Sequence, residues 1–567
     1  MKTNIKYIAV IATTGVVLAS CLKTEMVDRK NKDDFFKTET DAQTGLNGIY
    51  SYFYPNSYLK WNFHVIEAGS TDCLYTTGGE GQYVTGNTHD SRTAMATNAW
   101  ANYYNAINVA NNVIKYVPQI DFSPATRTVQ ERILAEAHFL RGLFYYELVR
   151  AYGGIDGVPL HLEPVETLEE AYLGDSPVEE VYQAIIDDLK YAALHRDGDP
   201  DHTKLPLAKE LVAEAGRVTN GAAHAYLADV YNTLGQWELA IKHADTVINS
   251  MQYSLMANYA DLWDIKKKAD AAAEKIFYVT AFADKEAAVA DGLGNAMAWL
   301  FNVNGFDANG GHISGDATGT GNGVIKVQKW FIRFFCKDID QLGYSDGARN
   351  EDDANLPSKD YRIETTFWRD YSTQNNTTGV FTSRKAYPAG TQNAHIRKYI
   401  DPTGANTRTN ANDVVKMRLA DMYLIKAEAW NELGEYEKAC EALDVIRARA
   451  RKANGTGRIW PKFVNLAQSD NIGRTLTKEQ FRWLVFMERG LEFAGEHKRW
   501  FDLKRMMWDN NTLMYDYMMN TYIPARIAEG SDWFATNSVM ASRKKFWPKP
   551  ENEIERNKGY VHQNPGF

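Results

Sequence analysis

A helix–turn–helix pattern that occurs twice is the feature that most constrains the fold of this 567-residue chain. In the first copy, residues 216–248, apolar residues recur at helical spacing on both sides of Leu234-Gly235. The second copy, residues 423–446, lies 199 positions later, with Leu433-Gly434 at the corresponding turn. A glycine at this position lets the chain leave one helix and begin the next. The pattern predicts two pairs of short antiparallel helices.

The two copies share more than their spacing. Seven residues of the second copy are identical to their counterparts in the first: Ala427, Asn431, Leu433, Gly434, Glu437, Ala439 and Asp444. Small residues at these places, with an aromatic residue after the turn, resemble a tetratricopeptide unit. Units of that kind usually follow one another about every 34 residues. The larger separation here predicts that a long insertion leaves the helical frame and returns to it.

The N-terminus predicts export. Residues 1–20 read as a lipoprotein signal peptide, in which the apolar run 7–18 is too short to span a bilayer. Leu18-Ala19-Ser20-Cys21 resembles a lipobox, whose cysteine is lipidated and becomes the mature N-terminus. An ordinary secretory signal with an incidental cysteine is the alternative. The polar segment 21–40 predicts a stalk.

Composition narrows the function classes. A net charge of −9 argues against a nucleic-acid partner. The chain has 32 Tyr and 14 Trp, residue types that sugar- and peptide-binding surfaces use. We expect no cofactor and no metal ligand set, because Cys73, Cys336 and Cys440 form neither a CxxC motif nor a zinc spacing. A Cys73–Cys336 disulfide is conceivable.

Periodicity divides the rest of the chain into two regions. Residues 41–270 predict an N-terminal helical region that carries a loop-rich segment, 55–98. The helix expected at 135–154 is apolar on most of its circumference, so we expect it to be buried on several sides. Residues 271–567 predict a C-terminal region, loop-rich over 271–412 and helical afterwards, with a short strand within 274–282.

Three constellations could suggest chemistry. Four carboxylates could suggest a glycosidase pair: Glu488, Glu492, Glu496 and Asp502. They fall on one predicted helix, 481–505, among basic residues, whereas glycosidase carboxylates flank a sugar from opposite sides, so we interpret them as salt-bridged structure. The glycine-rich segment 315–323 lacks the Lys-Ser/Thr of a phosphate loop. The acidic segment 338–353 could hold Ca²⁺, but its spacing does not fit an EF-hand, which favours a solvated loop.

Motifs spread along the chain resemble the SusD/RagB family of outer-membrane nutrient-binding lipoproteins. They are the lipobox at 18–21, residues 135–154, 216–248, 274–279, Lys-Asp-Tyr-Arg at 359–362, residues 418–434, 487–505 and the terminal 563–567. Each motif is weak alone, but their order along the chain is specific. Lys549 and Lys558 depart from residues common in the family and bear on the packing of the tail.

The resemblance implies a mostly α protein, in which tetratricopeptide-like helix pairs form a scaffold and an irregular, loop-rich subdomain is inserted. Members lie over a SusC-like TonB-dependent transporter, held in the outer membrane by the N-terminal lipid and facing the cell surface. They bind an oligomeric nutrient, most often a glycan and sometimes a peptide, and deliver it for import without catalysis. An exported glycoside hydrolase and a pure protein-interaction scaffold are the alternatives.

The ligand site is expected where two loop regions, 55–98 and 284–326, meet in an aromatic platform. A sugar ring stacks its C–H face on an aromatic ring, and its hydroxyls need polar partners at the rim. The candidate ligand-binding residues are Tyr75, Tyr83, Asn87, Asp90, Arg92, Trp299, Phe301, Asn304 and Phe306. Four other tryptophans are expected in core packing: Trp100, Trp237, Trp263 and Trp500.

Overall fold

The structure, a computed structural model, describes fourteen segments of the chain. They are residues 35–77, 89–210, 214–282, 294–302, 323–328, 330–332, 360–368, 370–374, 381–385, 394–401, 410–451, 476–528, 545–557 and 559–567. Statements below refer to these residues. The signal peptide, Cys21, the stalk up to residue 34, the glycine-rich segment apart from Gly323, and the acidic segment lie outside them.

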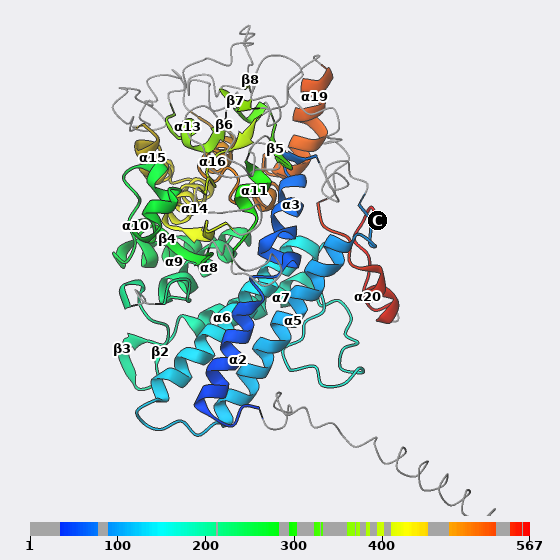
Figure 1. The fold of residues 1–567 in the computed structure, drawn as a ribbon, viewed down its shortest axis with the longest axis vertical. Helices are drawn as coiled ribbons and strands as arrows, with labels where there is room; N and C mark the ends of the chain where they lie inside the picture. The colour runs from blue at the N-terminus through cyan, green and yellow to red at the C-terminus, as the bar shows by residue number, and fades with distance from the viewer. Residues whose placement is uncertain are drawn as a thin grey trace, which may run out of the picture.

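Long helices form the lower layer of the molecule in Figure 1. Four helices pack against one another here: α2 (Glu39–Ser51), α5 (Ala94–Tyr116), α6 (Arg127–Tyr152) and α7 (Val178–Ala192). Elsewhere the chain also forms short 3₁₀ helices, at Val117–Gln119, Ala208–Glu210, Tyr259–Leu262 and Ile265–Lys267. α6 is central, and each of its residues from 139 to 149 is buried, as its apolar circumference predicts. Gly142 allows close approach of α7, because a Cβ atom there would lie 3.2 Å from the Cβ of Asp188.

The two repeat units stack directly on each other. α8 (Asn220–Thr233), α9 (Trp237–Asn249), α14 (Leu419–Glu432) and α15 (Tyr436–Arg451) pack in this order, so α9 contacts α14 across the insertion. Asn232 Nδ2 donates a hydrogen bond to Glu428 Oε2 at 3.0 Å between the units. Gly235 and Gly434 end the first helix of each unit with φ of +68° and +79°, a region that favours glycine. The mostly α fold with tetratricopeptide-like helix pairs is confirmed.

The strands are short, and several of them belong to the insertion. Two-stranded antiparallel ladders join β1 (Leu74–Thr76) to β5 (Ile325–Val327), β2 (His195–Arg196) to β3 (Asp199–Thr203), β4 (Lys275–Val279) to β10 (Val414–Arg418), β6 (Phe367–Trp368) to β9 (His395–Ile396), and β7 (Asp370–Gln374) to β8 (Phe381–Lys385). The strand expected within 274–282 is β4. Its ladder with β10 brings the two ends of the insertion together at the helical stack. Short helices α10 (Lys268–Ala271), α11 (Met297–Phe301) and α13 (Arg362–Thr366) complete this part.

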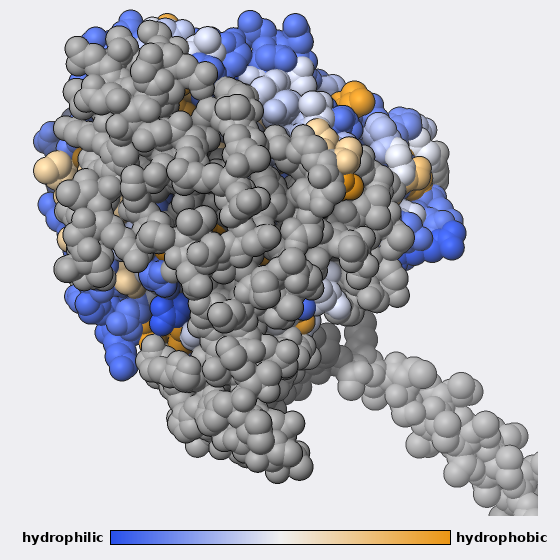
Figure 2. Space-filling view, turned by 90° about the horizontal axis from the view of Figure 1, so that it is seen from above, coloured by the Kyte–Doolittle hydropathy of each residue, from blue (hydrophilic) through white to orange (hydrophobic). Residues whose placement is uncertain are grey.

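The helical C-terminal part differs from the prediction at one point. The single helix expected over 481–505 is two: α16 (Lys478–Glu492) and α17 (Arg499–Arg505). The chain turns between them because Gly495 and His497 have φ of +77° and +63°, outside helical geometry. α18 (Met514–Tyr517), a π turn at Met518–Tyr522, α19 (Ile523–Ala528) and α20 (Glu551–Arg556) follow. Seen from above, the described part of the surface is mainly hydrophilic, with scattered hydrophobic residues (Figure 2).

The segment 55–98 is more regular than expected. It contains a π turn at Asn56–Lys60, the helix α3 (Asn62–Gly69), strand β1 and the start of α5. Every residue of α3 is buried. A helix buried on all sides has no polar face, so the sequence carries no helical periodicity to reveal it. Of the four tryptophans expected in the core, Trp100, Trp263 and Trp500 are buried, and Trp237 is half-buried.

Candidate functional site

The structure brings the two regions expected to form the platform side by side. β1 from the first region pairs with β5 from the second in the register Leu74–Val327, Tyr75–Lys326 and Thr76–Ile325. The ladder continues for one more bond, because the Thr77 backbone N–H donates to the Val324 carbonyl at 2.9 Å. Segments about 250 residues apart in sequence are thus held together by backbone hydrogen bonds.

A pair of half-buried indoles lies where these regions meet. The rings of Trp61 and Trp299 are 4.8 Å apart between centroids, with an interplanar angle of 43°. Trp61 precedes the first residue of α3, and Trp299 lies in α11. Sequence reasoning named Trp299 but missed Trp61. Its position in the expected loop region, among other aromatic residues, was the available signal.

Two of the other candidate rings lie in the core. Tyr75 is 2% exposed and Phe301 is fully buried, packing 5.3 Å from the ring of Tyr399. Burial raises the pKa of Tyr75, because the loss of water around its hydroxyl disfavours the charged phenolate. These two side chains therefore present no open ring face to a ligand.

The polar candidates are not gathered around the indole pair. Arg92 Nε pairs with Glu551 Oε2 in α20 at 2.6 Å, and Asp90 Oδ1 accepts the Arg92 backbone N–H at 2.9 Å. In Figure 1, α20 and α11 lie well apart. The remaining candidates, Tyr83, Asn87, Asn304 and Phe306, lie outside the described residues.

A buried polar contact fixes α3, and with it Trp61. His64 Nδ1 lies 2.7 Å from His497 Nε2, and His497 Nδ1 lies 3.1 Å from Glu67 Oε2. Burial lowers the pKa of His497 to about 3 and raises the pKa of Glu67 to about 8. These contacts join α3 to the turn between α16 and α17.

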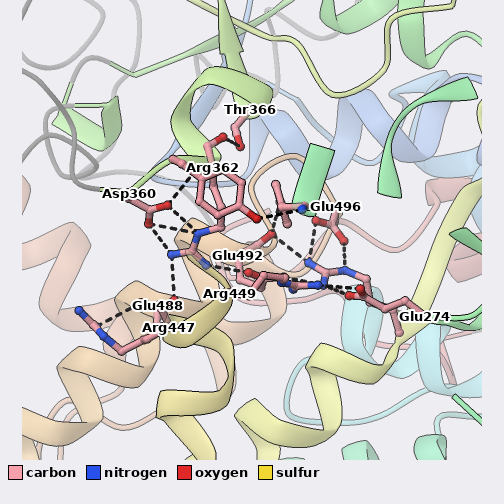
Figure 3. Close-up of polar contacts among 12 residues, drawn as sticks. Glu274, Asp360, Arg362, Thr366, Arg447, Arg449, Glu488, Glu492 and Glu496 are labelled. Carbon is pink, nitrogen blue, oxygen red and sulfur yellow. Dashed lines mark hydrogen bonds and ion pairs between the residues drawn. The ribbon is translucent and has the colours of Figure 1, made fainter. Parts of the chain in front are cut away.

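A larger network of buried ion pairs lies next to this turn (Figure 3). Five carboxylates balance five basic side chains: Glu274, Asp360, Glu488, Glu492 and Glu496 with Arg362, Lys398, Arg418, Arg447 and Arg449. All ten are buried. We refer to them as the ion-pair network. It joins the start of β4, α13, β10, α15 and α16, so it ties the insertion to the helical stack.

Arg418 is the centre of the network. Its guanidinium lies 2.8 Å from Glu274 Oε1, 2.6 Å from Glu492 Oε1 and 2.8 Å from Glu496 Oε2. Burial would raise the pKa of Glu492, but the charges of Arg449, Arg418 and Arg362 outweigh it and hold this pKa far below its usual range. Burial lowers the pKa of Lys398 to about 8, still above neutral pH.

The four carboxylates considered for glycoside hydrolysis are all engaged in ion pairs. Glu488 and Glu492 pair with Arg362 at 2.9 and 2.7 Å, and Asp502 pairs with Arg489 at 2.8 Å. Only Asp502 takes a partner from its own segment as expected. The three glutamates instead pair with basic residues from distant segments, among them Arg362, Arg418 and Lys398.

Comparison with known families now identifies the class of protein. Residues 270–567 match the model of the SusD family, and residues 25–232 match a model described as starch-binding, associating with the outer membrane. The matches and the fold together define a helical scaffold protein of the SusD type. The first model alone spans more than half of the chain, so the chain belongs to the SusD family.

Individual relatives agree with this assignment. SusD-like protein P2 of Formosa agariphila is 25% identical over the full length of both chains. The crystal structure of a SusD homolog from Bacteroides thetaiotaomicron superposes with a TM-score of 0.72 at 19% identity, covering 95% of this chain and 99% of that one. A laminarin-binding SusD-like protein gives a TM-score of 0.64 at 22% identity, covering 94% and 100%. Within the described residues, no helix has the length and apolarity needed to cross a bilayer.

The ion-pair network generates a stability prediction. Glu492→Gln removes one charge that three arginines share, leaving buried positive charge uncompensated. We expect the free energy of unfolding to fall by about 3–5 kcal/mol, measured by urea denaturation of the soluble protein. Glu437→Gln, on the exposed side of α15, is the matched control and should change it by less than about 0.5 kcal/mol. An equally stable Glu492→Gln variant would contradict this role.

The same network predicts loss of stability in acid. Because the folded pKa of Glu492 lies below its ordinary value of 4.5, the unfolded chain binds the proton first as pH falls. The stabilisation is fully present above about pH 4.5 and is lost as pH falls toward the folded pKa. Glu496 and Asp502, whose pKa values are also lowered by their basic partners against the effect of burial, add to this loss. Denaturation curves between neutral pH and pH 3 should show a shallower decline in Glu492→Gln than in wild type; parallel declines would refute the assignment.

Proposed function

We propose that this chain is a cell-surface binding protein that captures an oligomeric glycan and delivers it to a SusC-like TonB-dependent transporter in the outer membrane. The observation that carries the proposal is the Trp61–Trp299 pair, held between two distant regions of a SusD-family fold. A similar solved structure is that of a laminarin-binding protein. Half-buried indoles suit the C–H face of a sugar ring.

The arrangement of the molecule supports separate faces for the transporter and the ligand. α2, the first described helix, begins at the lower end of the long axis, and β6, β7 and β8 lie near the upper end (Figure 1). A lipid on Cys21, followed by the stalk, would hold the lower helical layer close to the membrane. Rigid helices offer a pre-formed docking surface, whereas the irregular side carries adaptable binding groups.

Binding without catalysis is the favoured mode of action. Each carboxylate considered for glycoside hydrolysis is ion-paired, so it is not available as the acid of a hydrolase. Peptide binding by the same architecture is the second candidate, and a parallel screen of glycans and peptides separates the two.

The indole pair gives the direct test of the binding function. Soluble protein that begins after Cys21 is screened on a glycan array, and the affinity for the strongest neutral ligand is measured by calorimetry. We expect Trp299→Ala to weaken binding by about 2 kcal/mol, or about 30-fold, because a central stacking ring is lost. The melting temperature should change little. Trp237→Ala, which removes a half-buried indole from α9, should bind normally. Full affinity in Trp299→Ala would place the site elsewhere, first in residues 371–411.

The lipid anchor and the partner are tested in the native host. A single acyl chain binds membranes only weakly, but several chains on one cysteine anchor a protein stably. We expect Cys21→Ala to leave the membrane fraction and to lose co-purification with a large outer-membrane protein. The wild-type protein should retain both after a salt wash. A Cys21→Ala protein that stays in the membrane would place the anchor elsewhere.

A further inference from the structure

Besides the Trp61–Trp299 pair, the molecule has a cavity where β4 meets the start of α8. It has a volume of about 590 Å³ and lies among β4, α10, the segment 208–209 and the turn before α8. This volume falls in the range of small-ligand sites, about 300–1,000 Å³. It adjoins another cavity of about 560 Å³, because Ala215, Gly216, Arg217 and Thr280 line both. Together they offer room for a chain of several sugar units.

Two aromatic rings line this cavity beside ammonium groups. Phe282 is 56% exposed, although it is a large apolar side chain, and Lys268 Nζ lies 5.2 Å from its ring centroid. Tyr278 is half-buried, with Lys275 Nζ 5.3 Å from its ring centroid. An accessible ring with an ammonium group over one face can stack its other face on a sugar, while the positive charge attracts a negative substituent of that sugar.

The charge of the lining is opposite to that of the whole chain. The lining contains the basic residues Lys209, Arg217, Lys268 and Lys275 and a single acidic residue, Asp413, while the chain as a whole carries −9. Asp413 forms ion pairs with two lysines: its Oδ1 lies 2.6 Å from Lys268 Nζ and its Oδ2 lies 2.9 Å from Lys275 Nζ. One carboxylate between two ammonium groups leaves a positive charge beside the rings. A cavity of this sign favours an anionic ligand.

We propose that this cavity is a second sugar site that takes an acidic oligosaccharide, with Phe282 and Tyr278 stacking on the sugar rings, Lys209 binding its carboxylate or sulfate groups and the charge of Lys268 attracting them. The inference rests on the proposed glycan-binding function and adds a ligand class and a location. The cavity and the Trp61–Trp299 pair share no residue. The two can therefore be tested separately.

Calorimetry with soluble wild-type protein tests the proposal. The probes are hexagalacturonate, which carries carboxylates, a sulfated carrageenan hexasaccharide, and neutral cellohexaose. We expect one of the two acidic probes to bind, and its affinity to fall between about 0.05 M and about 0.5 M salt as the ion pairs are screened. Phe282→Ala should weaken that binding about 10-fold through loss of the stacking ring. Tyr560→Ala, which truncates a ring that is 62% exposed in the C-terminal tail, should leave it unchanged.

Charge variants test the role of the lysines. Lys209→Gln together with Lys268→Gln should reduce both the affinity and its salt dependence. Lys268→Arg keeps the charge and should restore binding, which separates a charge effect from the loss of the hydrogen bonds that Lys268 Nζ donates to the Ala281 and Ala411 carbonyls. Melting curves of each variant check that the fold is kept.

The results that would overturn the inference differ from those that would overturn the proposed function. If neither acidic probe binds, or if Phe282→Ala binds as wild type does, the second site is refuted. The proposed function survives that result when a neutral glycan still binds through Trp299. If Trp299→Ala, but not Phe282→Ala, abolishes binding of the acidic probe, the acidic sugar belongs to the indole pair. Failure of every glycan refutes both.

Discussion

Burying charge is the constraint on which the rest of this structure depends. Arg418 is fully buried, and its guanidinium contacts Glu274, Glu492 and Glu496, which come from two distant parts of the chain. An arginine without partners in such a place would destabilise the fold by several kcal/mol. The insertion must therefore return to the helical stack in one register only. The ion-pair network specifies how the segments are joined, while apolar packing of α6 and the repeat helices supplies the main driving force for folding.

Local patterns were enough to predict the scaffold. Periodicity and the glycines at the turns predicted the helix pairs of both repeat units, because apolar and small residues recur at helical spacing on both sides of each turn. The same reasoning missed α3, since all of its residues are buried and no face is left polar. It also joined α16 and α17 into one helix. The apolar spacing continues through Gly495 and His497, so it does not reveal that the backbone at these two residues has positive φ angles.

The candidate site was predictable only in part. The meeting of the two aromatic-rich regions was inferred from composition, and the β1–β5 ladder brings those regions together. Composition does not show which of the rings face outward. Tyr75 and Phe301 have the same residue types as a stacking surface, yet both pack inside. The partners of Glu488 and Glu492 could not be predicted from sequence either, because long-range pairing depends on tertiary contacts between segments that lie far apart in sequence.

The contact between α9 and α14 has a consequence for how the protein assembles. Synthesis runs from the N-terminus, so α8 and α9 are complete before the insertion and α14 exist. Until then the face of α9 that α14 will cover is open to solvent, and the ends of the insertion are not joined. Closing a loop of this length adds little entropic cost beyond that of a shorter one, since the cost grows only with the logarithm of length. It does delay the contact, because pairing between distant segments is slow. The scaffold is thus finished late, when α14 closes the insertion, and until then the open face of α9 is exposed to contacts with other chains.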